Sequence, residues 1–315
     1  MPPTVLLTGA TGFIGGAVLA ALRTRDVRLR TLARRPVPGA DGVAERMRAD
    51  LTRPESLRGV CDGVDVLVHA ASHVGGDPRQ CRLVNEEGTA RLVAEAVRAG
   101  VGRVLYVSTA GVYGPGVHRG PAEDEVTRNP GSVTSASRAA AEDHVLAAGG
   151  CVLRPHLVYG PGDRWVVPAL VTLLARLPGW IDGGRPRTSL IGVRDLGRVV
   201  AALATTPTPP TPGQILHANH PQPVSIAEIG AALARQLGIR IPQGRISLAE
   251  ARAHAARHGL PERHLELVGA DHWYRSDRIW QVAACPPGAA FPRDLTHALP
   301  YYRPLLGTPG TATEG

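Results

Sequence analysis

The sequence predicts an α/β protein in which a doubly wound parallel sheet is followed by a smaller, mostly helical C-terminal lobe. Short apolar runs alternate with helical stretches through the first half of the chain. These runs are almost continuously apolar, as in parallel strands that are buried on both faces. The length of 315 residues also favours one large domain with a smaller lobe over a single small core.

The first element is an apolar run that ends in a glycine-rich turn and a helix, "TVLLTGATGFIGGAVLAALRTR". Further strands are expected in "VRLRTLAR", "VDVLVHAAS", "GRVLYVSTA", "CVLRPHLVYG" and "QILHAN". Helices are expected over Asn85–Ala99 and Ser135–Ala148, between these runs. Strands that alternate with helices indicate parallel βαβ units.

The glycine-rich turn "TGATGFIG" places Gly9, Gly12 and Gly15 directly between a strand and a helix. Gly9 allows a tight turn, Gly12 allows the backbone to approach a pyrophosphate, and Gly15 allows close packing of helix and strand. This context indicates a Rossmann-type dinucleotide-binding site, which would also include Thr11, Phe13 and Ile14.

The end of the second strand favours NADP(H) as the cofactor. An acidic residue at this point would bind the ribose hydroxyls of NAD, and "TLARRPVP" has none. Arg34 and Arg35 stand there instead and suit a 2′-phosphate. Asp50, followed by Leu51, is expected to reach the adenine edge.

After Tyr159 the chain becomes more helical, beginning with "GPGDRWVVPALVTLLARLPGW". Residues 205–213, "TTPTPPTPG", are expected to form a surface connection without helix. Ser225 and Glu228 form a capping box at the start of an amphipathic helix. We expect 1–160, with 188–219 returning to it, to bind the cofactor. Residues 161–187 and 220–305 are then the substrate lobe, and 306–315 a disordered tail.

Composition excludes several other classes of function. The net charge is +8 and all 35 basic residues are Arg, but they are spread along the chain without a basic tail, so nucleic-acid binding is not expected. The four cysteines include no C-x-x-C pair, which indicates reduced, buried thiols. His254 and His258 share a helix face, but without a third ligand they predict no metal site. No secretory signal or membrane span is evident, and we expect a cytoplasmic protein that binds no membrane.

The chain resembles the extended short-chain dehydrogenase/reductase family, which includes sugar-nucleotide epimerases and dihydroflavonol-type reductases. Seven stretches carry the resemblance, in family order over about residues 4–300. They are "TGATGFIG", "ADLTRPESL", "DVLVHAAS", "VNEEGTARLVAEA", "RVLYVSTAGVYG", "LRPHLVYGPGDRW" and "GVRDLGRVVAAL".

The resemblance implies roles for several residues. His69, Ala70 and Ala71 would line the adenosine and ribose side of the cofactor, and Pro155 would lie next to the nicotinamide. Asn85 would support the active-site strand, and Thr109 would hydrogen-bond the substrate carbonyl. The remaining residues that the resemblance places around the substrate are Ser72, His73, Val112, His156, Tyr159 and Trp165.

The chain departs from the family at its Tyr-x-x-x-Lys motif. Here the matching helix is "TSASRAAAEDHVL", which puts Thr134 in the place of Tyr and Arg138 in the place of Lys. No Tyr occurs between Tyr113 and Tyr159, so no shift of the alignment restores the motif. A Thr hydroxyl is far too weak an acid to replace Tyr, whereas Arg138 can still bind the ribose.

These observations predict an NADPH-dependent ketoreductase acting on a small-molecule ketone, such as an aromatic polyketide, with the proton supplied by a substrate phenol or by water. One alternative is a non-redox cyclase or dehydratase that uses His156, Asp163 or His144 as base. Another is a non-catalytic NADP(H)-binding sensor. The missing base argues against an epimerase, and either a monomer or a homodimer is compatible with the sequence.

Overall fold

The computed structural model describes residues 1–35, 42–260 and 262–306. Its centre is a seven-stranded sheet with strand order β12-β7-β5-β4-β1-β2-β3, in which every pairing is parallel. The strands are β1 (Thr4–Thr8), β2 (Arg28–Ala33), β3 (Glu45–Arg48), β4 (Val66–His69), β5 (Arg103–Val107), β7 (Cys151–Arg154) and β12 (Ile215–His217). The predicted doubly wound parallel sheet is therefore confirmed.

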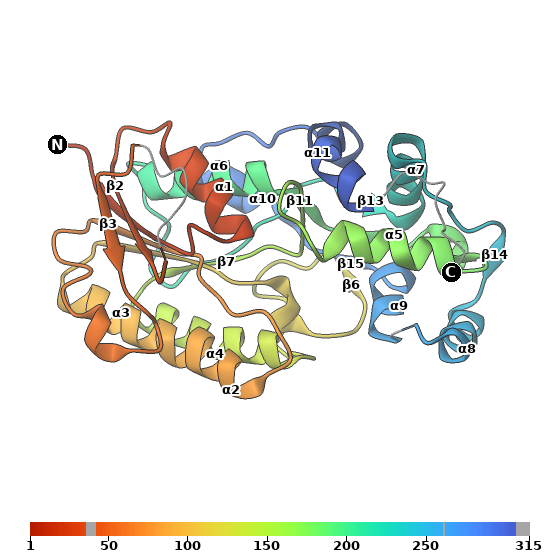
Figure 1. Cartoon of the computed structure of the whole chain (residues 1–315), viewed down its shortest axis with the longest axis horizontal. Helices are drawn as coiled ribbons and strands as arrows, with labels where there is room; N and C mark the ends of the chain where they lie inside the picture. The colour runs from red at the N-terminus through yellow and green to blue at the C-terminus, as the bar shows by residue number, and fades with distance from the viewer. Residues whose placement is uncertain (36–41, 261, 307–315) are drawn as a thin grey trace.

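Helices cover both faces of this sheet (Figure 1). On one face lie α1 (Phe13–Leu22) and α6 (Val193–Thr205), and on the other α3 (Gly88–Arg98) and α4 (Val133–Ala147). Successive side chains of a strand point to opposite faces. Val5 and Leu7 thus join the core beneath α1 and α6, and Leu6 joins the second core. This double burial explains why the strands read as continuous apolar runs.

The helix predicted over Asn85–Ala99 begins earlier in the structure. Its first turn is α2 (Pro78–Cys81), and a π-helical segment, η2 (Arg82–Glu87), joins it to α3. Asp77 caps α2 by accepting hydrogen bonds from the N–H groups of Arg79 and Gln80. The helix predicted over Ser135–Ala148 is α4, which begins two residues earlier because the Ser132 side chain caps it.

The strand predicted over residues 151–160 is two strands. Pro155, which has no N–H to give to a sheet, interrupts it. The chain leaves the central sheet after Arg154, and β8 (Leu157–Tyr159) pairs with β11 (Leu190–Gly192) in a separate two-stranded sheet. This break turns Pro155 and His156 out of regular strand pairing.

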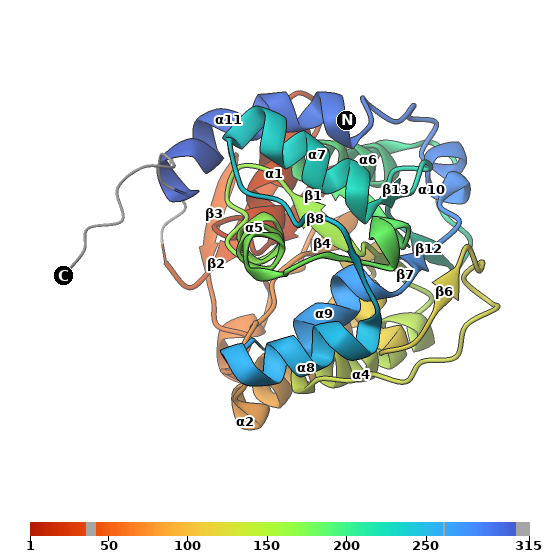
Figure 2. The same cartoon turned by 90° about the vertical axis from the view of Figure 1, so that its right-hand side faces the viewer.

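The C-terminal part has its own apolar core, formed largely by α5 (Val166–Arg176), α7 (Ile226–Leu237) and α11 (Phe291–Leu306). Viewed end-on, α5 lies centrally, with α7 and α11 above it and α8 (Leu248–His258) and α9 (Glu262–Gly269) below (Figure 2). The Ser225–Glu228 capping box of α7 is confirmed. The division into two domains at the boundaries given above stays a prediction.

Shorter elements complete the described chain. The 3-10 segments are η1 (Pro54–Leu57), η3 (Ala110–Tyr113) and η4 (Asp182–Gly184), and α10 (Asp277–Val282) lies beside α6 and β12. A four-stranded sheet has the order β13 (Val224–Ser225), β10 (Arg187–Thr188), β15 (His272–Trp273) and β6 (His118–Arg119). A two-stranded sheet pairs β14 (Arg245–Ile246) with β9 (Trp180–Ile181).

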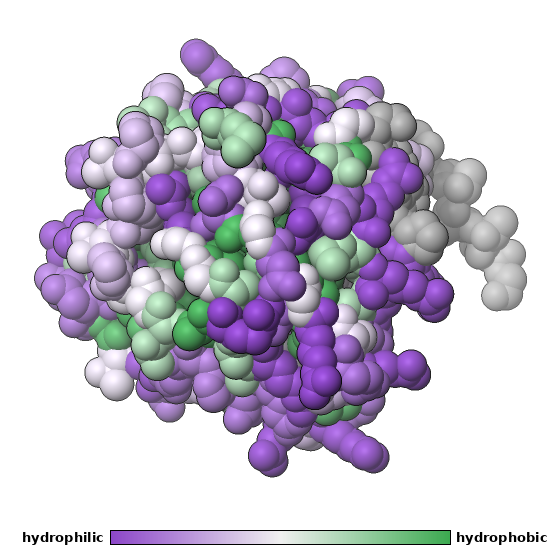
Figure 3. Space-filling model, turned by 90° about the vertical axis from the view of Figure 1, so that its left-hand side faces the viewer, coloured by the Kyte–Doolittle hydropathy of each residue, from purple (hydrophilic) through white to green (hydrophobic). Residues whose placement is uncertain are grey.

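Other expectations can be compared with this architecture. Thr205 still belongs to α6, while residues 206–213 contain neither helix nor strand. Leu306, predicted as the first residue of the tail, is instead the last residue of α11, and the rest of the predicted tail, 307–315, lies outside the described residues. All four cysteines are free and buried, as predicted. Hydrophilic residues cover most of the face beside β2 and β3, with small apolar areas among them (Figure 3).

Candidate active site

The glycine loop joins β1 to α1 at the carboxyl end of the parallel strands. Gly9 has a φ of +76°, and a Cβ at this position would come within 2.6 Å of the Ala70 and Ala71 backbone. A Cβ on Gly15 would overlap the Gly9 carbonyl oxygen. Gly12 is the N-cap of α1 and has no side chain to cap it, so the first N–H groups of the helix are open to an anion.

Hydrogen bonds hold His69 and the residues that follow it against the glycine loop. The Ala71 N–H donates to Thr8 Oγ1, which lies 2.6 Å from His69 Nδ1, and His69 Nε2 lies 2.9 Å from Thr89 Oγ1. Burial, and then the charge of Arg138, lowers the pKa of His69 to about 3, so the imidazole is neutral. Since His69 is fully buried and both of its ring nitrogens are engaged, its ring is not available to a cofactor, and the partly exposed residues of this segment are Ala70 and Ala71.

Arg34 and Arg35 follow β2 and are both exposed. Asp50 accepts hydrogen bonds from the N–H and hydroxyl of Thr52. Burial by itself would raise the Asp50 pKa, but these hydrogen bonds and the nearby charge of Arg34 lower it overall. The effect of the Arg34 charge on this carboxylate indicates that the two groups are near each other, and Leu51 is buried.

Thr109 stands at the end of β5, where its Oγ1 accepts the Gly111 N–H at 3.0 Å and caps η3. The hydroxyl proton is therefore free for a substrate oxygen. The next residue, Ala110, donates its N–H to the Pro155 carbonyl at 2.7 Å. This bond holds the Thr109 segment beside Pro155 and His156.

Thr134 does not present a free hydroxyl. Its Oγ1 donates to the Gly75 carbonyl at 2.9 Å and lies 3.4 Å from the Gly75 N–H. The Cys81 thiol approaches the same oxygen at 3.6 Å. The hydroxyl proton is thus engaged by the loop that follows β4, and Thr134 ties this loop to the start of α4.

Arg138 lies one turn further along α4 and is nine-tenths buried. One guanidinium nitrogen donates to the Val107 carbonyl, and the buried Nε has no hydrogen-bond partner among the described residues. Its neighbour on the same face, Glu142, is held by Arg154 and Ser108 instead. A buried cation with an open donor is suited to ribose hydroxyls.

The remaining predicted substrate residues differ in how far their side chains are exposed to solvent. Ser72 is exposed, and the backbone of His73 is held on both sides by the Asn85 side chain. Val112 is fully buried in a small core. Tyr159 is also buried, and its hydroxyl donates to Asp294. Trp165, at the start of α5, is 70% exposed.

Asn85 connects the π-helical segment with α4. Besides holding His73, its amide donates to Ser137 Oγ at 2.9 Å.

Asp163, one of the candidate bases of the non-redox hypothesis, is engaged in structural contacts. It is buried and caps α5, and its Oδ2 also accepts a hydrogen bond from the Tyr302 hydroxyl.

The sequence reasoning missed a buried polar chain behind the site. Arg154 pairs with Glu142 and donates to the Tyr113 hydroxyl at 2.8 Å, and this hydroxyl lies 2.6 Å from His217 Nε2. His217 Nδ1 contacts the Arg275 carbonyl and must be its donor, so Nε2 accepts the Tyr113 proton. No signal in the sequence pairs these residues, because they come from separate elements.

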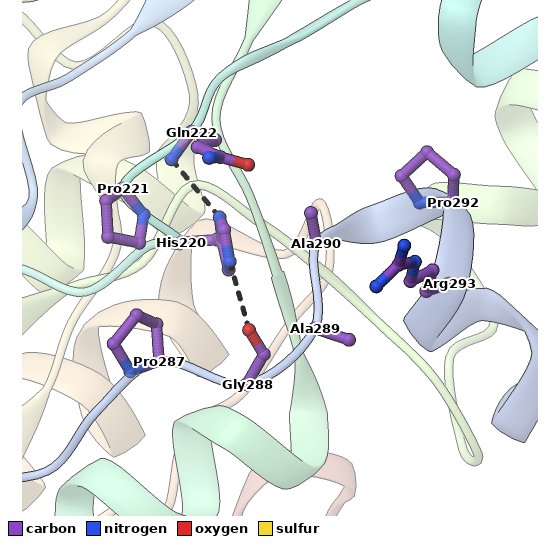
Figure 4. A pocket seen from close by; sticks show the side chains of 9 residues that line it. All are labelled: His220, Pro221, Gln222, Pro287, Gly288, Ala289, Ala290, Pro292 and Arg293. Atoms are coloured by element: carbon purple, nitrogen blue, oxygen red, sulfur yellow. Dashed lines mark hydrogen bonds between the residues drawn. The ribbon is translucent and has the colours of Figure 1, made fainter.

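A pocket of about 680 Å³ lies elsewhere, between the loop after β12 and the segment that leads into α11 (Figure 4). His220 stands in one wall, with its ring nitrogens held by the Gln222 N–H and the Gly288 carbonyl. None of the nine lining residues belongs to the predicted site.

The rings of His254 and His258 lie with their centroids 4.2 Å apart on α8 and are tilted by 36°, which confirms that they share a face. Within the described residues, no group of three or more His, Cys, Asp or Glu side chains is placed to hold a metal ion. Among the described helices, none combines the length and apolarity that crossing a membrane requires.

Comparison with protein families now adds to the geometry. Residues 5–217, which include the glycine loop, Thr109, Thr134 and Arg138, match the NAD dependent epimerase/dehydratase family. The chain belongs to this family. The match confirms the expected class of enzyme, an NAD(P)-dependent oxidoreductase. Relatives that are similar to this chain act on keto and hydroxyl groups.

Curated relatives cover most of the chain. It is 28% identical to a 3 beta-hydroxysteroid dehydrogenase/Delta 5-->4-isomerase of Mycobacterium tuberculosis (strain ATCC 25618 / H37Rv), over 96% of this chain and 91% of the relative. It is 29% identical to the 2-alkyl-3-oxoalkanoate reductase of Stenotrophomonas maltophilia (strain K279a), over 74% and 76%. With a ketoreductase of Stigmatella aurantiaca, whose name specifies a dihydroquinoline-1-oxide, it shares 28% over 79% and 78%.

Solved structures agree with the fold. The structure of gox2253 superposes with a TM-score of 0.75 at 22% identity, covering 97% of this chain and 99% of the other. MoeE5 in complex with UDP-glucuronic acid and NAD gives 0.70 at 23% identity, covering 96% and 99%. The family match supports the nicotinamide cofactor expected from the glycine loop, without a distinction between NAD and NADP.

Proposed function

We propose that this protein is an NADPH-dependent ketoreductase that reduces a ketone of a small-molecule natural product, an aromatic polyketide, to an alcohol. The proton that completes the reduction comes from a phenol of the substrate or from water. This function belongs to antibiotic biosynthesis. Among atypical reductases, the chain resembles the ketoreductase acting on the angucyclinone part of simocyclinone.

One observation carries the proposal: the groups suited to hydride transfer are present while the proton donor is replaced. The glycine loop is open to an anion, and Arg138 retains an unpartnered buried donor. The Thr134 hydroxyl donates a hydrogen bond to the Gly75 carbonyl. Hydride transfer requires mainly position and driving force, so the chemistry survives if the proton has another source.

The substrate itself can supply that proton. A phenol next to the ketone is already hydrogen-bonded to the carbonyl oxygen, and it is a far stronger acid than Thr. As hydride reaches the carbonyl carbon, the phenol proton passes to the forming alkoxide, and water then reprotonates the phenolate. Losing a general acid typically slows a reaction by about 10² to 10⁴-fold, which this arrangement offsets.

The preference for NADP(H) rests on Arg34 and Arg35. Both guanidinium groups are exposed directly after β2, where an acid would favour NAD. We assign the nucleotide to the glycine loop, Asp50, Leu51 and the His69–Ala71 backbone, with Pro155 at the nicotinamide. The substrate then lies against Thr109, with Ser72, His73, His156 and Trp165 around it.

Of the three candidate bases of the non-redox alternative, which are His156, Asp163 and His144, Asp163 is committed to capping α5, and this favours ketone reduction. The names of the Stenotrophomonas and Stigmatella relatives also specify reductases of keto compounds. A non-catalytic NADP(H) sensor remains the second candidate, and the hydroxyl proton that Thr109 keeps free argues against it.

Deuterium transfer tests the proposal directly. NADPH labelled at the reactive nicotinamide carbon is incubated with a panel of phenolic polyketide ketones, and the products are analysed by mass spectrometry. We expect one deuterium in the alcohol. NADPH binding without any transfer of label across the panel would instead support a non-redox enzyme or a sensor.

Methylation of the neighbouring phenol separates the two proton sources. With 8-hydroxy-1-tetralone and 8-methoxy-1-tetralone as paired probes, turnover of the methoxy compound falls by about 10² to 10⁴-fold if the phenol is the acid. An equal rate for both probes identifies water as the source.

A further inference from the structure

His156 lies in a segment that is hydrogen-bonded to the segment carrying Thr109. It directly follows Pro155, whose carbonyl accepts the Ala110 N–H, and its own N–H donates to Asn219 Oδ1 at 2.7 Å. Asn219 is fully buried, and its amide donates to Ser276 Oγ. The His156 backbone is thus fixed on both sides, next to the segment that carries Thr109.

The His156 ring has an unsatisfied nitrogen. Its Nε2 atom is buried and has no hydrogen-bond partner among the described residues, and in one tautomer of the neutral ring it carries the N–H. The ring packs against Tyr274 and His272, with centroid distances of 5.5 and 5.9 Å. A buried polar atom without a hydrogen-bond partner lowers the stability of the folded protein, and a ligand that reaches it would relieve that cost.

The ring is also neutral. Burial, followed by the neighbouring His272, His118 and His217, lowers the pKa of His156 to about 3. A neutral imidazole is a poor proton donor, but its single N–H can hydrogen-bond a carbonyl oxygen and polarise it.

We infer that His156 donates its Nε2–H to the substrate oxygen undergoing reduction and so replaces the hydrogen bond that the family Tyr would make. This inference rests on the proposed ketone substrate. The two tasks of the missing Tyr are then divided: His156, with Thr109, polarises the carbonyl, and the phenol or water supplies the proton.

The balance of the step is simple. Hydride moves from the nicotinamide to the carbonyl carbon, the carbonyl π bond breaks toward oxygen, and the alkoxide takes the phenol or water proton. NADPH is oxidised and the ketone is reduced. His156 keeps its proton throughout, so no further acid is required to restore it.

Three variants test this assignment. His156→Gln can place an amide N–H near the Nε2 position, His156→Asn places it near Nδ1, and His156→Phe has no donor. With 8-hydroxy-1-tetralone and NADPH, we expect kcat/KM within about 10-fold of wild type for Gln and a loss of about 10²-fold or more for Asn and Phe. His258→Gln, on the exposed end of α8, is the matched control and should change nothing.

A binding measurement separates this inference from the proposed function. Calorimetric titration of 8-hydroxy-1-tetralone into the NADP⁺-bound protein should give a Kd about 10-fold weaker for His156→Phe than for wild type. NADP⁺ binding and thermal unfolding should match wild type in each variant, which excludes misfolding as the cause. Equal ketone affinity in wild type and His156→Phe, or a fully active His156→Phe, would overturn the role of His156. Ketone binding that depends on His156 without any turnover would refute the reductase but keep the assignment.

Discussion

At the scale of single residues, the structure shows what engages Thr134, the residue that we expect to stand in the place of the family Tyr. Its hydroxyl bridges α4 to Gly75 and has no proton left to give. The role of this side chain is to fix the loop after β4 to the helix that carries Arg138.

Thr134→Ala should therefore retain most of the reductase activity, with kcat within about 10-fold of wild type. The expected change is smaller than the loss of a general acid, about 10² to 10⁴-fold, because Thr134 does not act as one. Steady-state kinetics with NADPH and a ketone substrate measure it. A fall beyond about 10²-fold in a normally folded variant would show that Thr134 is the acid.

Arg34 provides the second prediction at this scale. Arg34→Ala should raise the NADPH Kd by about 10-fold and leave the NADH Kd nearly unchanged, because only NADPH carries the 2′-phosphate. Fluorescence titration measures both constants. Arg28→Ala, at the exposed start of β2, is the control. Equal effects on both cofactors would contradict a phosphate contact.

At the scale of elements, the glycine loop depends on close packing between β1, α1 and β4. Gly15→Ala should weaken cofactor binding and lower stability by about 1–3 kcal/mol, since its Cβ would overlap the Gly9 carbonyl. Gly16→Ala is a matched control one residue away, where the nearest atom to a Cβ is Ala10 O at 3.6 Å. Urea unfolding and NADPH titration of both variants make the comparison. Similar losses in both would contradict a steric cause.

The Glu142–Arg154 pair joins α4 to β7 within the buried polar chain. Glu142 is fully buried and Arg154 nearly so. Glu142→Gln leaves the Arg154 charge uncompensated, and we expect the free energy of unfolding to fall by about 3–5 kcal/mol. The exposed neighbour Asp143→Asn should cost less than about 1 kcal/mol in the same urea titration. A small effect of Glu142→Gln would show that the pair does not anchor the helix.

At the scale of the whole molecule, buried neutral histidines make folding sensitive to acid. His69 and His156 have pKa values lowered to about 3 in the folded protein, and burial is the main cause. The unfolded chain binds protons near pH 6.5, where the folded chain does not. Stability from these groups is therefore complete above pH 6.5 and is lost as pH falls below it.

The resulting change in the free energy of unfolding with pH can be measured. Between about pH 7.5 and about pH 5.5, His69 alone should lower the free energy of unfolding by about 1 kcal/mol. Urea unfolding across this range measures the slope. His69→Gln should reduce the slope by the share of His69 and leave that of His156, whereas the exposed His258→Gln should leave the slope as in wild type. An equal slope in His69→Gln and wild type would contradict the assignment.

The sequence by itself determined the fold class and the glycine loop, and it predicts that the Tyr-x-x-x-Lys pair is replaced. These features rest on local signals: continuous apolar runs, glycines at fixed spacing, and one short stretch of a helix. A capping box such as Ser225–Glu228 is local in the same way, and the structure confirms it.

Only the tertiary structure decided which of these residues meet. It tied Thr134 to Gly75, which lies 59 positions earlier in the chain, and placed Tyr113 against His217 across 104 positions. It also broke the expected strand at Pro155, whose carbonyl accepts the Ala110 N–H, and within the described residues it left the Nε2 of His156 without a hydrogen-bond partner. The physical reason is that burial and hydrogen bonding between distant segments depend on how strands and helices pack, and no local pattern records that packing.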